Sequence, residues 1–488
     1  MIFNSIQFIV FFIVVVTAYY ILPHKFRWGL LLFASYIFYM AWKPSYIILI
    51  LLCTLVNYIA ALEIKKNRDK KIRKLWLIFS LGISLGVLFI YKYLGFINES
   101  LMNVFTYMNF NYPVGHFDIL LPMGISFYTF QSLSYTIDVY RGDTEPERNF
   151  FYLSLYVTFF PQLVAGPIER SDRLLPQFKE YVPFDIHMIV DGVKIMIIGF
   201  FKKIVIADRI AVAVNAVYNA PGSYSGIYFI LATVLFAFQI YCDFSGYSQI
   251  AIGASKVLGI DLMQNFDRPY LSKSIQEFWR RWHISLSTWF RDYVYIPLGG
   301  SRVGKTRYYM NLMITFLLSG LWHGASWNFV IWGGLHGLYQ VIGHMTSKYR
   351  DRFKALTKLE GTFLLKFSQL VFIFALTCFA WIFFRANTFS DSIYIVRNLF
   401  SDIAMWTDTT YIYSVFNNMG LSLFELLLGI GSVILLVIAE IMSRRKPLAE
   451  TIKNSNFLIE GSFYMVILII IMTMGVYFDG NQFIYFQF

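Results

Sequence analysis

The stretch that decides the fold class is SGLWHGASWNFVIWGGLHG, residues 319–337. It is apolar and rich in glycine and tryptophan, yet it carries two histidines, His323 and His336. An ionisable side chain in such apolar surroundings is typical of a membrane-embedded site and is usually functional. A second stretch, SIQEFWRRWHISLSTWFRDYVYIPLGG (residues 274–300), contains His283. We therefore expect the chemistry of this chain to lie within residues 274–337.

The composition of the whole chain agrees with a membrane protein. Of its 488 residues 57% are apolar and 19% are aromatic, and the mean hydropathy is +0.57. Only 14% are charged, whereas soluble domains have roughly 25%. Apolar runs of about 20 residues, the length of a transmembrane helix, recur along the chain. The sequence predicts an all-α, multi-pass membrane protein that forms one domain over residues 1–488.

The net charge of +12 has two interpretations. A basic chain can bind nucleic acid, but the lysines and arginines here cluster between apolar runs, as they do in cytoplasmic loops of membrane proteins. We therefore expect no nucleic-acid partner. The three cysteines, Cys53, Cys242 and Cys378, lie in apolar segments at unrelated spacings. They predict neither a disulfide framework nor a zinc site.

The apolar runs predict about 11–12 tilted transmembrane helices, with re-entrant and interfacial helices among them. The segment EIKKNRDKKIRK (residues 63–74) has seven basic and two acidic residues and is expected to be cytoplasmic. Three spans precede it, which places the N-terminus outside. No cleavable signal is evident, and the first span is expected to be retained.

Three features interrupt the predicted spans. PQLVAGPIER (residues 161–170) has two prolines and a glycine, which predicts a broken or re-entrant helix. Four charged residues in the run 188–217 predict an interfacial helix end: Lys202, Lys203, Asp208 and Arg209. Asp243 lies in an apolar segment, where it is either a hydrogen-bonding residue between helices or a site residue.

Residues 274–293 have a helical pattern of aromatic and apolar side chains. These recur at intervals of three and four and predict one face of a helix: Phe278, Trp282, Leu286, Trp289 and Tyr293. Arg280, Arg281, Arg291 and Asp292 lie largely off that face. An aromatic face opposite an arginine-rich face is typical of a helix in the membrane interface. His283 lies between the two faces.

The segment GGSRVGKT (residues 299–306) matches the phosphate-loop pattern literally. A phosphate loop joins a strand to a helix, and no strand is predicted before this segment, so we reject a nucleotide hydrolase. Arg302 and Lys305 could instead meet lipid head groups or a phosphorylated donor.

His323 is the strongest candidate for catalysis. Gly320 and Gly324 permit close approach of a substrate, Trp322 provides an apolar wall, and a neutral imidazole can act as a general base near pH 7. His336 follows 13 residues later, which on one continuous helix is about 20 Å away and on a different face. The two cannot touch one reacting atom unless a glycine breaks the helix. Both could also be ordinary hydrogen-bonding residues of a membrane interior.

Four segments together resemble the membrane-bound O-acyltransferase (MBOAT) family, in its branch of alginate and peptidoglycan O-acetyltransferases. They are LPMGISFYTFQSLSYTIDVYRG (121–142), FFPQLVAGPIERSDRLLPQF (159–178), EFWRRWHISLSTWFRDYVYIPLGGSR (277–302) and residues 319–337. The best-matched core is residues 115–345. The resemblance implies a ring of tilted helices around a thin centre. It also implies that His323 is the catalytic histidine, that His283 is a second functional histidine and that His336 has a recurrent but unassigned role.

The resemblance further implies a reaction. The family takes acetyl from cytoplasmic acetyl-CoA and passes it across the bacterial cytoplasmic membrane toward an exported polysaccharide, often through an extracytoplasmic SGNH-type partner. Two alternatives stay open: D-alanyl transfer to teichoic acid from a carrier protein, and a polysaccharide or lipid transporter. We expect membrane lipids as surroundings and no bound cofactor or metal. The expected substrate-binding residues are His336, Trp322, Trp282, Arg280, Arg281, Arg291, Asp292, Arg302 and Lys305.

Overall fold

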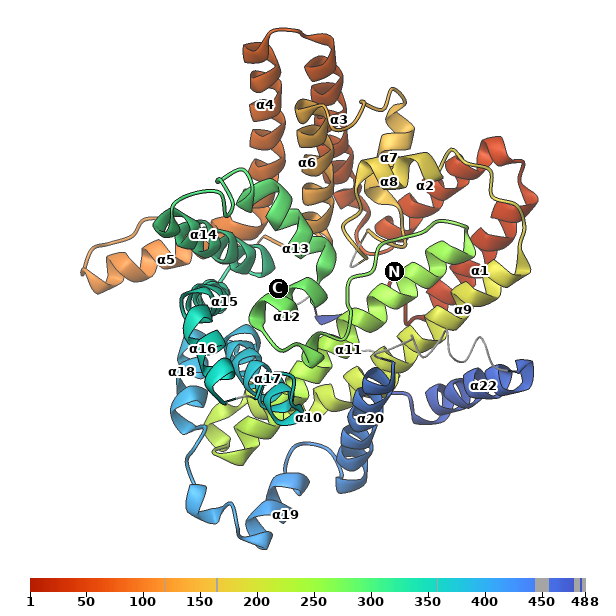
Figure 1. Ribbon diagram of the computed structural model, residues 1–488. Helices are drawn as coiled ribbons and strands as arrows, with labels where there is room; N and C mark the ends of the chain where they lie inside the picture. The colour runs from red at the N-terminus through yellow and green to blue at the C-terminus, as the bar shows by residue number, and fades with distance from the viewer. Residues whose placement is uncertain (118, 164–165, 358, 444–455, 478–482, 485–488) are drawn as a thin grey trace. The chain divides into compact units, whose positions relative to one another are not determined.

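Figure 1 shows the computed structural model of the chain, which describes residues 1–117, 119–163, 166–357, 359–443, 456–477 and 483–484. These residues form helices, turns and irregular segments, and none of them lies in a strand. The predicted all-α fold is therefore confirmed for the described residues. They group into two compact units. The first unit is Met1–Met196 with Ser248–Gln264, and the second is Ile197–Tyr247 with Asn265–Phe488.

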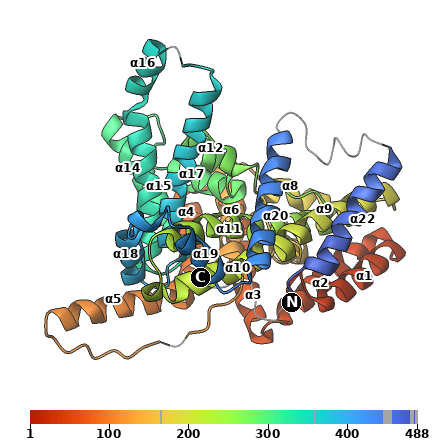
Figure 2. The ribbon, with the colours of Figure 1, turned by 90° about the horizontal axis from the view of Figure 1, so that it is seen from below.

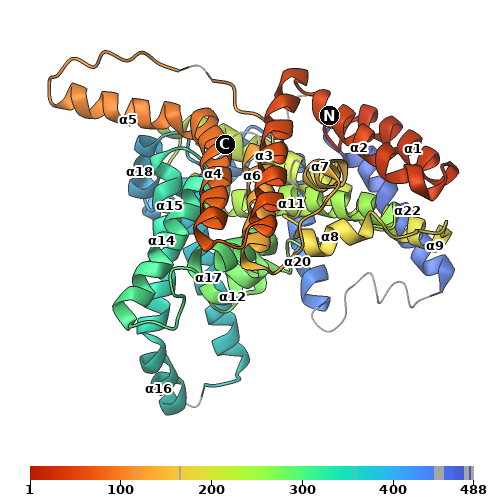
Figure 3. The ribbon, with the colours of Figure 1, turned by 90° about the horizontal axis from the view of Figure 1, so that it is seen from above.

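The end of α11 (Ile227–Val257), from Ser248 onward, belongs to the first unit. Among the described residues, the other helices of this unit lie before residue 196 or, in the case of α9, extend just past it. They are α1 (Ile6–Ile21), α2 (His24–Met40), α3 (Ile47–Lys66), α4 (Lys70–Leu88), α5 (Leu94–Tyr107), α6 (Ile125–Arg141), α7 (Phe150–Thr158), α8 (Ser171–Gln177) and α9 (Ile186–Phe200), with the short segments η1 (Pro44–Tyr46) and η2 (Phe89–Tyr93). Helices α3, α4 and α6 lie side by side (Figure 3).

A buried asparagine joins these three helices. The side-chain amide of Asn57 on α3 donates to Ser84 Oγ at 2.9 Å. Its Oδ1 accepts from Ser80 Oγ at 3.0 Å and from Thr136 Oγ1 at 2.6 Å. Ser80 and Ser84 are on α4, and Thr136 is on α6. Hydrogen bonds of this kind hold membrane helices together, where no hydrophobic effect drives helix association.

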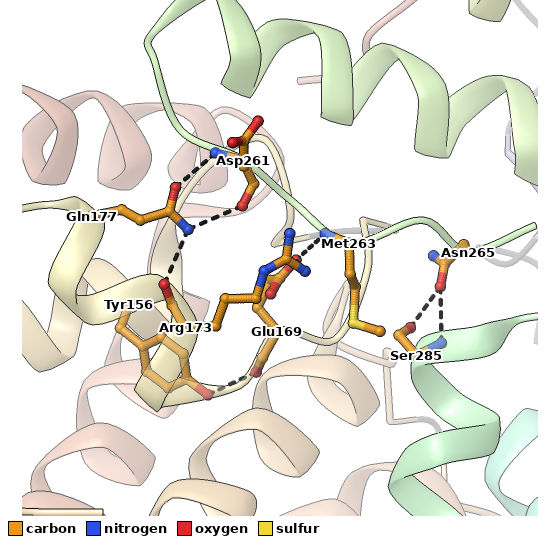
Figure 4. A network of polar contacts seen from close by, with 8 residues as sticks. All are labelled: Tyr156, Glu169, Arg173, Gln177, Asp261, Met263, Asn265 and Ser285. Atoms are coloured by element: carbon orange, nitrogen blue, oxygen red, sulfur yellow. Dashed lines mark hydrogen bonds and ion pairs between the residues drawn. The ribbon is translucent and has the colours of Figure 1, made fainter. Parts of the chain in front are cut away.

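The predicted break near residue 161 is confirmed. Helix α7 ends at Thr158, and the chain turns through Pro161 without continuing as a helix. Residues 164 and 165 of the same motif lie outside the described residues. After the break, the fully buried Glu169 accepts from the Met263 backbone N–H and lies 3.5 Å from Arg173 Nη1 (Figure 4). Gln177 binds the backbone of Asp261 through both its amide atoms. These contacts fix the chain after the break to residues 261–263.

The second unit holds the aromatic core. Its helices are α10 (Asp208–Asn219), α11 (Ile227–Val257, as far as Tyr247), α12 (Ile275–Arg281), α13 (Ile284–Phe290), α14 (Lys305–His323), α15 (Trp327–Met345), α16 (Ser347–Thr357), α17 (Phe363–Arg385), α18 (Phe389–Asn398), α19 (Thr409–Asn417), α20 (Leu423–Met442) and α22 (Phe457–Met474). The short segments are η3 (Phe201–Ala207), η4 (Pro221–Ser223), η5 (Pro269–Leu271), η6 (Arg291–Tyr295) and η7 (Ile403–Met405). The basic helix α16 projects past the ends of α15 and α17 (Figure 2). The largest fully buried side chains of this unit include Trp282, Trp332 and Trp381.

The predicted interfacial helix end at Lys202–Arg209 is wrong. All four charged residues there are buried in the protein, at 3–8% exposure. Lys203 Nζ lies 2.8 Å from Asp208 Oδ1 and 2.5 Å from Asp243 Oδ1. The segment η3 is a π-helix that continues into α10. Burial of Lys203, Asp208 and Asp243 is tolerated because these three charges are paired. Asp243 makes the contact between helices that the sequence left as one of two alternatives.

Among the residues that the structure describes, five helical segments are long and apolar enough to cross a membrane. They are Pro44–Lys66, Lys70–Tyr107, Ile227–Val257, Phe363–Arg385 and Leu423–Met442, and two shorter apolar helices are Ile6–Ile21 and Leu458–Met474. The chain is thus a multi-pass membrane protein. Other stretches with the hydropathy of a span form shorter or interrupted helices, so the count of 11–12 stays a prediction. The basic run at residues 444–446, expected to be cytoplasmic, lies outside the described residues.

Candidate active site

His283 lies at a break between two short helices. The sequence predicts one helix over residues 274–293, and this prediction is wrong: α12 ends at Arg281 and α13 begins at Ile284. His283 has a left-handed backbone conformation (φ 43°, ψ 57°), which a right-handed helix excludes. The backbone of Asn265 accepts the Ile284 N–H at 2.9 Å, and its side chain accepts from Ser285 Oγ at 2.6 Å (Figure 4). Asn265 thereby holds the break in place.

The break also turns the aromatic side chains into the protein. Phe278, Trp282, Leu286 and Trp289 are 0–6% exposed, so they pack in the core instead of anchoring an interfacial helix. Trp282 stacks on Phe278 with ring centroids 5.5 Å apart. The structure places Trp282, expected to bind substrate, inside this core with no exposed surface.

His323 is the last residue of α14. Gly324 follows in an extended conformation, and α15 begins three residues later at Trp327. The two helices form a hairpin that packs at backbone contact. A Cβ on Gly320 would lie 2.2 Å from Phe329 O, and a Cβ on Gly333 would lie 2.3 Å from Phe316 O. The helix is broken at Gly324, and this break allows His323 and His336 to contact a common neighbour.

The structure brings His283 and His323 together. Their ring centroids are 6.4 Å apart at an interplanar angle of 63°. Both side chains are buried, with exposures of 0% and 3%. Trp322 lies against both rings, 6.0 Å from His283 and 5.0 Å from His323, and Phe244 of α11 meets His283 edge-on at 4.6 Å. Two imidazoles from different segments therefore share one apolar, aromatic-walled site.

His336 is in the same core but on the far side of Trp332. The Trp332 ring lies 4.9 Å from His323 and 4.9 Å from His336. His336 has no exposed surface and stacks near Phe278 at 6.1 Å. Its only polar contact among the described residues is the indole N–H of Trp279, which donates to Nδ1 at 3.3 Å. His336 is thus separated from the His283–His323 pair by a tryptophan.

A pocket of about 440 Å³ lies among residues of α12, α13 and α14, a size in the range of small-ligand sites. It is lined by Gln276, Trp279, Arg280, Ile284, Leu286, Ser287, Thr288, Phe290, Arg291, Tyr295, Leu312, Thr315, Phe316, Ser319 and Gln340. Ile284 follows His283 directly, and Ser319 lies one helical turn before His323. The lining therefore includes a neighbour of each histidine along the chain, although neither His283 nor His323 itself lines the pocket.

The predicted arginines divide into two groups. Arg280 and Arg291 line the pocket, and Arg291 pairs with Asp292 at 2.7 Å. Arg281 does not line it and pairs with Glu277 at 2.7 Å. Arg302 and Lys305 are exposed residues at the start of α14, outside the pocket lining. Among the described residues, no group of three or more histidine, cysteine, aspartate or glutamate side chains has an arrangement that could hold a metal ion.

The model of the membrane-bound O-acyltransferase family matches residues 148–386. A probable alginate O-acetylase from Pseudomonas putida is 39% identical over 392 residues, covering 79% of this chain and 78% of that protein. The chain belongs to the MBOAT family. It is also 35% identical to the peptidoglycan O-acetyltransferase of Helicobacter pylori, over 76% of this chain and 73% of that protein. The teichoic acid D-alanyltransferase of Bacillus subtilis is 28% identical, over 55% and 69%.

Family membership makes this chain an acyltransferase and argues against the transporter alternative. The matched residues 148–386 include both histidines of the pair and the whole pocket lining. The resemblance to the MBOAT family that the sequence motifs indicated is therefore confirmed. The roles of individual residues stay predictions, because sequence comparison does not test them.

Several residues of this MBOAT site were not identified from the sequence. Trp279 lines the pocket, Trp332 and Phe384 lie 4.9 and 5.5 Å from the His323 ring, and Phe244 contacts His283. Phe384 stands in an apolar run that is typical of an ordinary membrane helix, and Trp279 stands beside the arginines on which the sequence analysis concentrated. Contacts between distant segments, not local pattern, define these positions.

Proposed function

We propose that this acyltransferase moves an acetyl group from cytoplasmic acetyl-CoA toward hydroxyl groups of an exported polysaccharide. The single observation that carries the proposal is the buried His283–His323 pair, whose chain neighbours Ile284 and Ser319 line a pocket that also presents two arginines, Arg280 and Arg291. A CoA thioester carries phosphates, which arginine binds through charge-assisted hydrogen bonds. Relatives named as alginate and peptidoglycan O-acetyltransferases support acetyl as the acyl group.

His323 is assigned as the general base. A neutral imidazole takes the proton of the acceptor hydroxyl while the hydroxyl oxygen attacks the thioester carbonyl carbon. The carbon–sulfur bond then breaks, and the imidazolium returns the proton to the departing thiolate, so that ester and free thiol are formed. His283, with its ring 6.4 Å away, is assigned to hold the donor against this base.

The remaining parts of the proposal concern sidedness and partner. The basic segment at residues 63–74 supports a cytoplasmic location for that loop and an outside N-terminus, in a bacterial cytoplasmic membrane. We infer an extracytoplasmic SGNH-type partner that completes transfer to the polysaccharide. The sequence of this chain has no G-x-S-x-G elbow of its own, which supports that division of labour.

A second candidate is D-alanyl transfer from a carrier protein to teichoic acid, which the likeness to the Bacillus subtilis enzyme favours. The purified protein incubated with radiolabelled acetyl-CoA separates the two. Acetyl-CoA turnover that requires His323 is the expected result. No turnover of acetyl-CoA, with turnover of a D-alanyl carrier protein instead, would contradict the proposal.

A substitution of one pocket residue tests whether the pocket binds acetyl-CoA. Arg280→Gln removes a pocket cation and is expected to raise the KM for acetyl-CoA about tenfold, since a hydrogen bond to a charged group contributes about 1.5–3 kcal/mol. Lys273→Gln removes an exposed cation near the start of α12, outside the pocket, and is the matched control. Equal KM values for the two variants would remove Arg280 from donor binding.

A further inference from the structure

His336 occupies a closed aromatic compartment in α15. The rings of Trp332, Trp279, Tyr339, Phe278 and Phe316 surround it with centroids 4.9–6.4 Å away. No surface of His336 is exposed. A residue enclosed in this way does not touch a substrate in the pocket, which differs from the substrate contact expected from the sequence.

The hydrogen bond to Trp279 fixes the chemical form of His336. An indole N–H can only donate, so Nδ1 of His336 must be the acceptor at 3.3 Å. An accepting Nδ1 carries no proton, and the ring is therefore neutral with its proton on Nε2. Nε2 has no hydrogen-bond partner among the described residues. The polar function of His336 is thus confined to the Trp279 indole.

Two of the rings around His336, Trp279 and Trp332, also contact the candidate active site. Trp279 lines the pocket directly. Trp332 lies 4.9 Å from His336 and 4.9 Å from His323, with steep ring angles of 69° and 84° that let it fill the space between them. A change at His336 is therefore transmitted to the pocket wall through Trp279 and to the candidate base through Trp332.

We propose that His336 is a positioning residue for acyl transfer: as a neutral acceptor, it holds the Trp279 indole as a wall of the donor pocket. This inference rests on the proposed function in so far as the pocket is the donor site. An unsatisfied buried donor destabilises a structure by about 1–3 kcal/mol. A buried indole N–H that loses its acceptor is therefore expected to reorient. Trp279 would then turn out of the orientation that shapes the pocket.

The test compares two side chains of similar shape. His336→Asn places Oδ1 close to the position of Nδ1 and keeps an acceptor, whereas His336→Leu has the same branching and no acceptor. His336→Leu is expected to raise the KM for acetyl-CoA by about 5- to 30-fold with a smaller change in kcat. His336→Asn is expected to stay within about threefold of the wild-type KM. His344→Leu is the control, since His344 is an exposed histidine of the same helix that meets Tyr309 OH at 3.3 Å.

Trp279→Phe completes a double-mutant cycle. Trp279→Phe alone should raise the KM as His336→Leu does, and adding His336→Leu to it should have no further effect, because the donor N–H is already gone. An unchanged KM in Trp279→Phe, or fully additive effects in the double variant, would overturn the proposal. A pH profile of kcat/KM that His336→Asn shifts would also overturn it, since the neutral ring does not titrate in this role.

An NMR measurement without substrate tests the Trp279–His336 contact independently of the proposed function. In the detergent-solubilised full chain labelled with ¹⁵N-tryptophan, Trp279→Phe identifies one indole resonance. His336→Leu should move that resonance upfield, as loss of a hydrogen bond does, and His336→Asn should move it less. If wild-type protein does not turn over acetyl-CoA but the resonance behaves in this way, the donor assignment fails and the Trp279–His336 coupling stands. A resonance that neither variant moves contradicts the coupling itself.

Discussion

The imidazole rings of His283 and His323 lie 6.4 Å apart, although they belong to different helical segments of the chain. His283 reaches this position because its own left-handed backbone lies between α12 and α13, and His323 because α14 stops at Gly324. Each histidine therefore stands at a helix end, where its ring projects toward the other. The local breaks in the helices create the pair, and Trp322 lies against both rings.

The left-handed backbone of His283 allows its structural role and its chemical role to be tested separately. Asparagine adopts this conformation more readily than other non-glycine residues, so His283→Asn should fold and remove only the imidazole. Because His283 is assigned to hold the donor against His323, we expect an acyl-transfer rate lower by about 10²-fold, the loss that misplacement of a reactant by about 1 Å can cause, with little change in thermal stability. His187→Asn, at an exposed position, is the control. Near-normal turnover by His283→Asn would limit His283 to a role in packing.

The hairpin of α14 and α15 should be sensitive to a single methyl group at Gly320. Gly320→Ala would place its Cβ 2.2 Å from Phe329 O and 3.2 Å from Gly333 Cα, both backbone atoms. Overpacking of this kind costs about 1–3 kcal/mol or more, and we expect a lower midpoint of thermal unfolding. At Gly334, one residue after Gly333, a Cβ meets only a Leu317 side-chain atom at 3.6 Å. Gly334→Ala should be nearly neutral, and equal losses in the two variants would be inconsistent with this packing.

Glu169 gives the first unit a dependence on pH. Burial raises the pKa of its carboxyl from 4.5 to about 7, although the Met263 N–H and Arg173 favour the charged form. Between about pH 4.5 and pH 7 the folded state binds more protons than the unfolded state, so this group contributes stability at low pH that is lost as the pH rises through 7. Glu169→Gln should remove that component of the pH dependence of thermal unfolding. Glu180→Gln, at an exposed carboxyl, should leave it unchanged. A pH dependence that persists in Glu169→Gln would contradict this role of Glu169.

Part of this architecture could be predicted from the sequence. Apolar runs such as residues 224–253 predicted helices, since burial in lipid requires a continuous apolar stretch. Pro161 predicted the break after α7, because proline has no N–H to donate and its ring clashes with a preceding turn. His323 was identified by its apolar, glycine-rich surroundings and by the family resemblance.

Other features depend on contacts between distant segments. Lys203 looked like a residue of the interface, and its two carboxylate partners include Asp243, which lies on another helix. The regular spacing from Phe278 to Tyr293 predicted one helix, but Asn265 stabilises a turn at His283 that helical periodicity alone does not reveal. The partnership of His336 with Trp279 likewise joins α12 to α15. The periodicity of apolar residues thus predicts helices, whereas hydrogen bonds between distant segments determine where a helix such as α12 ends.

The most direct test of the central claim is acetyl transfer by His323→Ala, measured as radiolabelled acetyl-CoA turnover and as acetylation of the exported polysaccharide in cells. With His344→Ala as the matched control and normal amounts of folded protein in the membrane, we predict loss of both activities in His323→Ala alone. Acetylation at the wild-type level in His323→Ala would contradict the assignment of His323 as the catalytic base.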